Sequence, residues 1–203
     1  MTAIAASTIA AQAFRFMEMD PIGSFADGSP QAAAAAEQYP AALDFSLEAH
    51  DWSFARKLAA LPQIVGVDGL DPDLPFRYSL PSDCVRLRKV CTSWSGYRWR
   101  QDGRIIRSNQ ALSLDIRYTF RIQNEALLPA SFQTVVSLAL AVRLMPVWVS
   151  SRTKRADVRK ELTDAIAAAW TADQHSASYE RMDGRPEQPD WASEAVATGR
   201  MNG

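Results

Sequence analysis

Residues 49–62, "AHDWSFARKLAALP", bring together side chains that could do acid–base chemistry. His50, Asp51 and Arg56 lie within a few residues of one another. Acid–base catalysis by a histidine needs a positioned partner, and none can be identified; the only other histidine, His175, lies near the opposite end of the chain. The same spacing is typical of a packing segment that ends a helix, and we favour that interpretation.

Sequence motifs for catalysis or cofactor binding are missing from the chain. It has no GxSxG, P-loop, GxGxxG, HExxH or EF-hand pattern. Cys84 and Cys91 are seven residues apart in one predicted strand, which fits neither a CxxC pair nor a metal-ligand pair, so we expect buried free thiols and, weakly, a cytoplasmic site of synthesis. We therefore expect no enzyme, no cofactor and no metal site.

Composition is that of a globular protein with an ordinary core. The 203 residues are 47% hydrophobic and 22% charged, and the formal net charge is -1. The overall charge therefore indicates no particular class of partner. The N-terminus has no basic stretch before its apolar residues, which argues against a secretory signal. The most hydrophobic stretch, 134–150, is shorter than a membrane span and carries Arg143 and Pro146; we interpret it as a buried core helix.

One region is charged unevenly. Nine basic residues lie between Asp83 and Arg121, against three aspartates. Strand alternation should gather several of them on one face of a sheet, either as a solvated outer face or as a contact for DNA phosphates or an acidic partner. The neighbouring Trp94, Tyr97 and Trp99 could stack on bases, but core packing is the simpler interpretation. The basic residues are Arg86, Arg88, Lys89, Arg98, Arg100, Arg104, Arg107, Arg117 and Arg121.

Helical patterns occupy both ends of the chain. We expect a first helix over 4–18 and a second that starts at Pro30 with Ser29 as its N-cap, with a kink or restart at Pro40. Residues 132–149 are apolar on nearly all sides, which predicts a buried helix. A long amphipathic helix should cover 152–182; its apolar stripe is Val158, Leu162, Ile166 and Trp170.

Between these helices, residues 54–122 alternate with period two and predict a small antiparallel sheet. The dipeptide Asp102-Gly103 favours a tight hairpin between "YRWR" and "RIIRS". Three cations, Arg152, Lys154 and Arg155, open the last helix, where the helix dipole disfavours positive charge. They indicate either an exposed cluster or a contact with an acidic partner. The candidate strands are "FRYSLP", "CVRLRKVC", "YRWRQDGRIIRS" and "LSLDIRYTFRI".

Four stretches follow one another along the chain: "PIGSFADGSPQAAAAAEQY", "LEAHDWSFARKLAAL", "FRYSLPSDCVRLRKV" and "LLPASFQTVVSLALAVRLM". In this order they resemble the head-to-tail adaptor family of short-tailed phages, the tail tubular protein A type. The resemblance covers roughly residues 10–180 and includes the motif Tyr-x-Leu-Pro-x-Asp-Cys-x-Arg, here Tyr78 to Arg86. It places Trp52, Phe54 and Ala55 as a packing hinge between helices and sheet.

The resemblance implies a mainly-α fold, an antiparallel helical bundle with an inserted small antiparallel β-subdomain (α+β). The helical body would comprise 1–53 and 129–183, and the β-subdomain 54–128. Residues 184–203 would be an extended C-terminal tail that docks on a partner.

The function implied is that of a virion structural protein. Copies would assemble into a ring, usually of twelve, between the portal protein and the tail nozzle protein, with DNA passing through the channel and touching it non-specifically. The protein would be made in the host cytoplasm and would not contact a membrane. A nucleic-acid-binding module that uses the basic sheet face remains the alternative.

Two surfaces follow as hypotheses from this resemblance and from the charge pattern. A bulky apolar side chain in a polar tail can bury substantial area on a partner, which favours the tail residues named here as anchors. The portal interface would comprise Arg152, Lys154, Arg155, Trp191 and Met201, and the surface facing the nozzle or DNA would comprise Arg98, Arg100 and Arg104.

Overall fold

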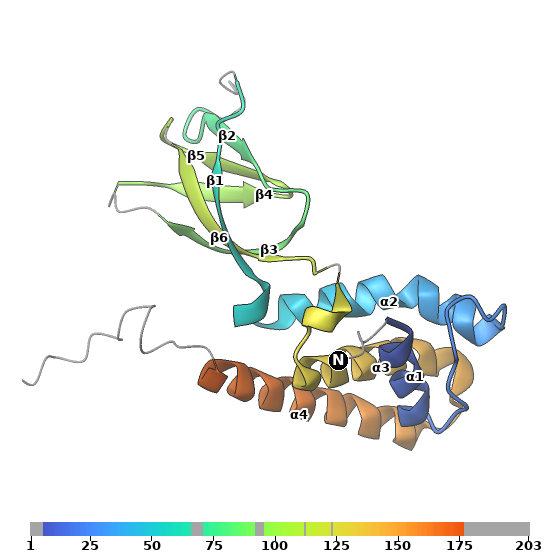
Figure 1. Ribbon diagram of the computed structural model, residues 1–203. Coiled ribbons are helices and arrows are strands. Elements are labelled where there is room, and N and C mark those ends of the chain that lie inside the picture. Colours follow the sequence, from blue (N-terminus) through green and yellow to red (C-terminus); the bar gives the residue numbers. More distant parts are fainter. Residues whose placement is uncertain (1–5, 66–70, 92–95, 112, 123, 177–203) are drawn as a thin grey trace, which may run out of the picture.

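The computed structural model describes residues 6–65, 71–91, 96–111, 113–122 and 124–176. Four α-helices pack together as one body, and six strands form a β module that projects from it (Figure 1). The helices are α1 (Ala6–Phe16), α2 (Pro30–Ala49), α3 (Ala130–Trp148) and α4 (Arg152–Ser176), with short 3-10 turns η1 (Ser53–Ala55) and η2 (Glu125–Leu127). The strands are β1 (Arg56–Leu61), β2 (Phe76–Ser79), β3 (Cys84–Cys91), β4 (Trp99–Asp102), β5 (Ile105–Ser108) and β6 (Leu114–Phe120).

The helical body is built around α3. This helix contacts α1, α2 and α4, and most of its side chains are buried, which explains why it is apolar on nearly all sides. By length and composition α3 could cross a membrane, but more than half of its apolar window is buried inside the protein. Its environment is that of a core helix, as the sequence predicted.

Helix α2 begins as expected but does not break at Pro40. The Ser29 side chain accepts a hydrogen bond from the Ala32 N–H at 3.1 Å, and Pro30 occupies the first turn. The predicted kink or restart at Pro40 is wrong, because one helix runs from Pro30 to Ala49. Proline removes one backbone hydrogen bond, and burial of Ala35 and Tyr39 before it and Leu43 after it offsets that loss.

Helix α4 is amphipathic as predicted, and all four residues of the predicted stripe pack against the helical core, Ile166 and Trp170 while partly exposed. Val158 and Leu162 are buried, but Ala169, not Trp170, continues the buried face. A stripe with four-residue spacing drifts around a helix of 3.6 residues per turn, so Trp170 ends at the margin of the contact. Residues 177–182 of the predicted helix lie outside the described residues.

The strands form two three-stranded antiparallel sheets, where a single sheet was predicted. Sheet A has the order β1-β6-β3 and sheet B the order β2-β5-β4. Strand β1 was not among the candidate strands, because "RKLAAL" leaves Leu58 exposed and shows no clean alternation. The hairpin at Asp102-Gly103 is confirmed: β4 and β5 are joined by a two-residue loop in which Gly103 has φ 60°.

The β module has a hydrophobic core of its own. Its buried residues form a cluster distinct from the helical core, and Phe120 packs against both. About 50% of the described residues are helical and 22% are in strands, so the protein is α+β, and the expectation of a mainly-α fold is wrong. The β module core comprises Leu61, Tyr78, Leu80, Cys84, Val90, Ile106, Leu114, Ile116 and Tyr118.

Candidate functional site at the joint of helices and sheets

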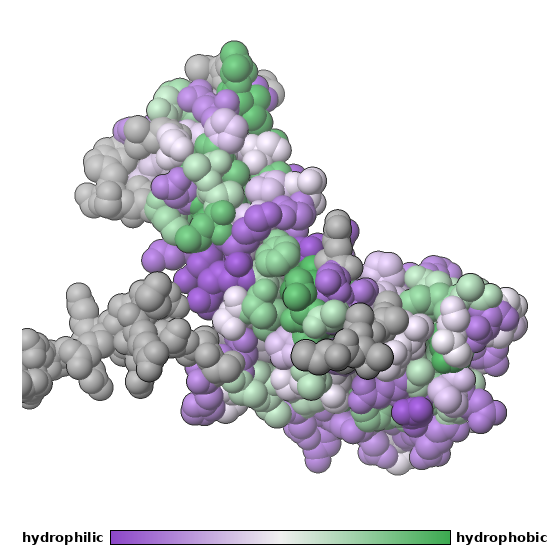
Figure 2. Space-filling model, viewed as in Figure 1, coloured by the Kyte–Doolittle hydropathy of each residue, from purple (hydrophilic) through white to green (hydrophobic). Residues whose placement is uncertain are grey.

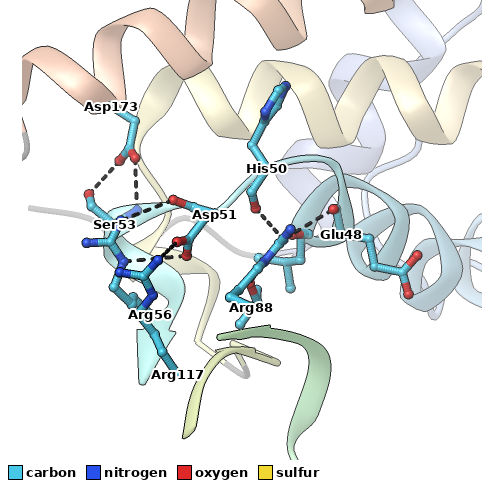
Figure 3. Close-up of polar contacts among 10 residues, drawn as sticks. Glu48, His50, Asp51, Ser53, Arg56, Arg88, Arg117 and Asp173 are labelled. Atoms are coloured by element: carbon cyan, nitrogen blue, oxygen red, sulfur yellow. Dashed lines mark hydrogen bonds and ion pairs between the residues drawn. The ribbon is translucent and has the colours of Figure 1, made fainter. Parts of the chain in front are cut away.

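The joint between the helical body and the β module contains many polar contacts. It comprises the end of α2, the segment from His50 to Arg56, Arg88 of β3, Arg117 of β6 and Asp173 of α4 (Figure 3). Hydrophilic residues gather between the two bodies in the space-filling view (Figure 2). We call this region the joint.

Arginines from β3 satisfy the last carbonyl groups of α2. The Arg88 guanidinium donates from Nη2 to the carbonyl oxygens of Leu47 at 2.8 Å and Glu48 at 3.2 Å, and also to that of His50. The Arg86 Nη1 donates to the Glu48 carbonyl at 2.9 Å. The carbonyls that end a helix have no partners within the helix, and cations are favoured beside them. The two arginines therefore fasten β3 onto the end of α2.

The Arg88 side chain is held on both sides of the joint. Its Nε donates to Thr119 Oγ1 of β6 at 2.7 Å, which fixes the plane of the guanidinium. Burial, followed by the neighbouring Arg86, lowers the pKa of Arg88 from its ordinary value. That value is so high that the side chain stays charged under all physiological conditions. The joint is thus built around a half-buried, permanent cation.

An aromatic cluster lies on the helical side of the joint. The Trp52 ring is fully buried, 5.0 Å from the Phe132 ring between centroids, and its Nε1 donates to the Ser46 carbonyl at 2.9 Å. Phe54 lies 4.9 Å from Phe132. Ala55, the third predicted hinge residue, is also buried. The structure thus places all three in the packing between η1 and the helices.

Two carboxylates complete the joint. The Asp51 carboxylate pairs with Arg56 Nε at 3.4 Å and with Arg117 Nη2 at 3.0 Å. The buried Asp173 carboxylate of α4 accepts the Ser53 backbone N–H at 2.9 Å and the Ser53 hydroxyl at 2.6 Å. Asp173 therefore fixes η1 to the end of α4, and Asp51 fixes the segment before η1 to β6.

His50 is part of this packing. Its ring stacks on Trp170 of α4 with centroids 4.7 Å apart. Burial, with a smaller contribution from Arg88, lowers the pKa of His50 below its ordinary value. His175 is exposed near the end of α4. Across the described parts of the chain, no group of three or more His, Cys, Asp or Glu side chains is placed to hold a metal ion.

Most cations of the basic region form ion pairs or hydrogen bonds within the protein. Arg100 pairs with Asp71 and Asp102, and Arg107 also pairs with Asp102. The predicted single basic face is wrong, because β3 and β4 belong to different sheets and the arginines of β3 point to α2.

Some of the remaining cations of the basic region also have internal partners, and others do not. Arg104 donates to the carbonyls of Pro81 and Cys84, and Arg121 pairs with Asp44. Among the described residues, Lys89 and Arg98 are the cations of this region whose side chains contact no acceptor. Of the three cations predicted to face the nozzle or DNA, Arg98 is thus the one whose side chain contacts no acceptor in the described parts of the chain.

The predicted portal-facing residues are only partly available. Arg152 is exposed and Arg155 is half-buried at the start of α4. Lys154 is taken up internally, because its Nζ contacts Glu18 at 2.5 Å and donates to the Met17 carbonyl at 2.9 Å. The structure brings these three cations together in one turn. The two predicted tail anchors, Trp191 and Met201, lie outside the described residues.

Sequence reasoning found part of the joint and missed the rest. Its prediction that 49–62 is a packing segment fits the contacts of Trp52 and Asp51. It named Arg88 only as one cation of the basic region and did not name Asp173, because the partners of both lie far away in the sequence. The pair Arg86 and Arg88 on alternate residues was the available signal.

Comparison with known proteins gives no relative from which a function could be transferred. No protein-family model matches the chain, and no curated protein matches it.

Proposed function

We propose that this protein is a virion structural protein of a short-tailed phage, a head-to-tail adaptor. Copies would form a ring, usually of twelve, that binds the portal protein on one side and the tail nozzle protein on the other. DNA would pass through the channel of the ring. The proposal starts from the sequence resemblance and is supported by the arrangement of the two bodies.

The observation that carries the proposal is the joint. The two bodies have separate cores, and hydrogen bonds and ion pairs of Arg88, Arg86 and Asp51 hold them together. An adaptor needs two outward surfaces in a defined orientation, so that each copy meets its neighbours and both partners alike. The hydrogen bonds from Arg86 and Arg88 to the carbonyl groups at the end of α2 hold the two bodies in one orientation, which meets this need. Catalysis has no comparable support among the described residues, where polar side chains near His50 are used in packing.

Many modest contacts repeated around a closed ring would give tight assembly through multivalency. The portal contact would include Arg152 and Arg155 at the start of α4, because Lys154 is already bonded to the two residues that follow α1. The nozzle contact would lie on the β module near Arg98.

Mass photometry of the purified protein, alone and mixed with the portal ring of its own phage, tests the proposal. We expect a saturable increase in the mass of the portal that approaches one copy of this chain per portal subunit. A portal mass that stays unchanged across several salt concentrations would overturn the adaptor function.

The alternative, a nucleic-acid-binding module, has less support because most cations of the basic region are engaged internally. It requires the monomer to bind duplex DNA with an affinity that falls steeply with salt. An electrophoretic mobility shift at two salt concentrations separates the two functions: the adaptor should show only weak binding at both.

A further inference from the structure

The face of sheet A that points away from the β core contains a hollow. Ala60 of β1, Asp115 of β6 and Cys91 of β3 are directly paired across the sheet, so their side chains share this face. Together with Leu58 they line a depression of about 400 Å³. Leu58, at its rim, is 71% exposed. The small side chains of Ala60 and Cys91 leave the space open.

The hollow combines apolar walls with one free acid. Asp115 is exposed and makes no ion pair among the described residues. The cations next to Asp115 along the same face are Arg117, which is already paired with Asp51, and Lys89, which is exposed. A fitting occupant would therefore carry an apolar side chain with a cation close beside it.

Such a surface exists at the far end of the helical body. Val147 in the last turn of α3 is 76% exposed, and Pro146 beside it is exposed as well. Arg143 lies four residues before Val147, so the two side chains share one face of the helix. Arg143 is exposed and makes no ion pair with any described residue. An aliphatic group and a free cation are thus presented together.

The two surfaces cannot meet within one molecule. Helix α3 begins beneath the β module and ends on the opposite side of the helical body (Figure 1). Over the residues from Ala130 to Val147 an α-helix rises about 25 Å. A contact between the hollow and the end of α3 must therefore join two copies. Because it pairs two different surfaces, it is head-to-tail, the kind of contact that forms a ring when its rotation closes.

We propose that the hollow on sheet A of one copy receives Val147 and Pro146 of the next copy, with Arg143 paired to Asp115. This inference rests on the proposed function and identifies the subunit interface of the ring. Burial of Leu58 against Val147 supplies the apolar contact, and the ion pair sets its register.

Cysteine cross-linking tests the contact directly, because Cys91 already lies in the hollow. In assembled protein carrying Val147→Cys, mild oxidation or a short bis-maleimide should link neighbouring copies into a ladder on non-reducing gels. The double variant Val147→Cys with Cys91→Ser should give no ladder. Thr163→Cys, at an exposed position of α4, is the matched control and should not link. Absence of the ladder in assembled protein, or its persistence without Cys91, would overturn the contact.

A charge swap tests the ion pair without a covalent cross-link. Asp115→Arg and Arg143→Asp should each weaken assembly by about tenfold, and the two changes together should restore it. Asp164→Arg, at an exposed site on α4, should leave assembly unchanged. All of these sites are at the surface, and circular dichroism verifies that each variant folds.

The outcomes distinguish this inference from the proposed function. A ring that forms on the portal but gives neither cross-links nor charge rescue would overturn the interface and leave the adaptor function standing. A wild-type chain that associates with neither itself nor the portal would overturn both. Cross-links in an assembly that does not bind the portal would support the interface and contradict the adaptor function.

Discussion

The Arg88 guanidinium of β3 donates to the Leu47 carbonyl at the end of α2 at 2.8 Å, across 41 residues of sequence. This contact joins the two bodies of the protein at the point where α2 would otherwise end in unpaired carbonyl groups. It is the centre of the joint, and the strength of the joint can be measured.

Replacement of Arg88 should destabilise the fold strongly. Arg88→Ala leaves the carbonyls of Leu47 and Glu48 without these donors, and we expect a loss of about 2–4 kcal/mol in the free energy of unfolding. Arg88→Lys keeps the charge but not the planar fork, so it should recover only part of that loss. Urea unfolding followed by circular dichroism measures both. Lys89→Ala, at an exposed neighbour, should change the stability by less than about 0.5 kcal/mol; an equal effect there would contradict the role of Arg88.

His50 should make the stability depend on pH near neutrality. Its pKa in the folded protein lies below the ordinary value of 6.5, so the unfolded chain binds its proton first as pH falls. The stabilising contribution is therefore complete above about pH 6.5 and is lost as pH falls toward the lowered folded pKa. In urea unfolding between about pH 7.5 and pH 5.5, the wild type should lose more stability than His50→Gln. Equal slopes would show that His50 contributes nothing in this range.

The bond between Ser53 and Asp173 should couple η1 to α4. Asp173→Ala removes the acceptor of two hydrogen bonds and should cost about 2–3 kcal/mol, more than Ser53→Ala. In the double variant the losses should not add, because both changes break one contact. Thermal unfolding gives the three values. Asp164→Ala is the exposed control on the same helix, and full additivity of the two main changes would argue against the contact.

Gly103 should be required by the backbone of the β4–β5 hairpin. It has φ 60°, and a Cβ placed there would meet no atom within 4 Å, so any cost of a side chain is conformational. Gly103→Ala should destabilise the protein by about 1 kcal/mol, and Gly103→Asn by less, because asparagine tolerates this conformation. Thermal unfolding of the two variants tests the order; a larger loss for asparagine would contradict it.

The start of α4 should be needed for portal binding if the proposed function holds. Charge reversal at both Arg152 and Arg155 should lower the occupancy of the portal ring in mass photometry by about tenfold or more. Lys160→Glu, an exposed reversal on the outer part of the same helix, provides the control. Unchanged occupancy in the double variant would remove this surface from the portal contact.

Local features were predictable from the sequence because their causes lie within a few residues. The Ser29 cap, the Asp102-Gly103 hairpin and the buried character of α3 follow from capping geometry, turn conformation and the share of apolar side chains. Each depends on neighbours along the chain. The adaptor function and its interfaces also came from the sequence, and they stay predictions.

Tertiary structure decided what depends on distant partners. Packing on both sides of Pro40 keeps α2 continuous, although the isolated sequence predicts a break. Strand β1 exists because β6 pairs with it, and the strands form two sheets around a core of their own. Most arginines of the basic region bond to carbonyls and aspartates that the fold brings near. Arg88 and Arg117 do so in the joint, and Arg100 does so within the β module, so a charge pattern that suggested a binding surface proved to consist largely of internal contacts. A charge pattern shows where cations occur, whereas only the folded chain determines which of them remain free.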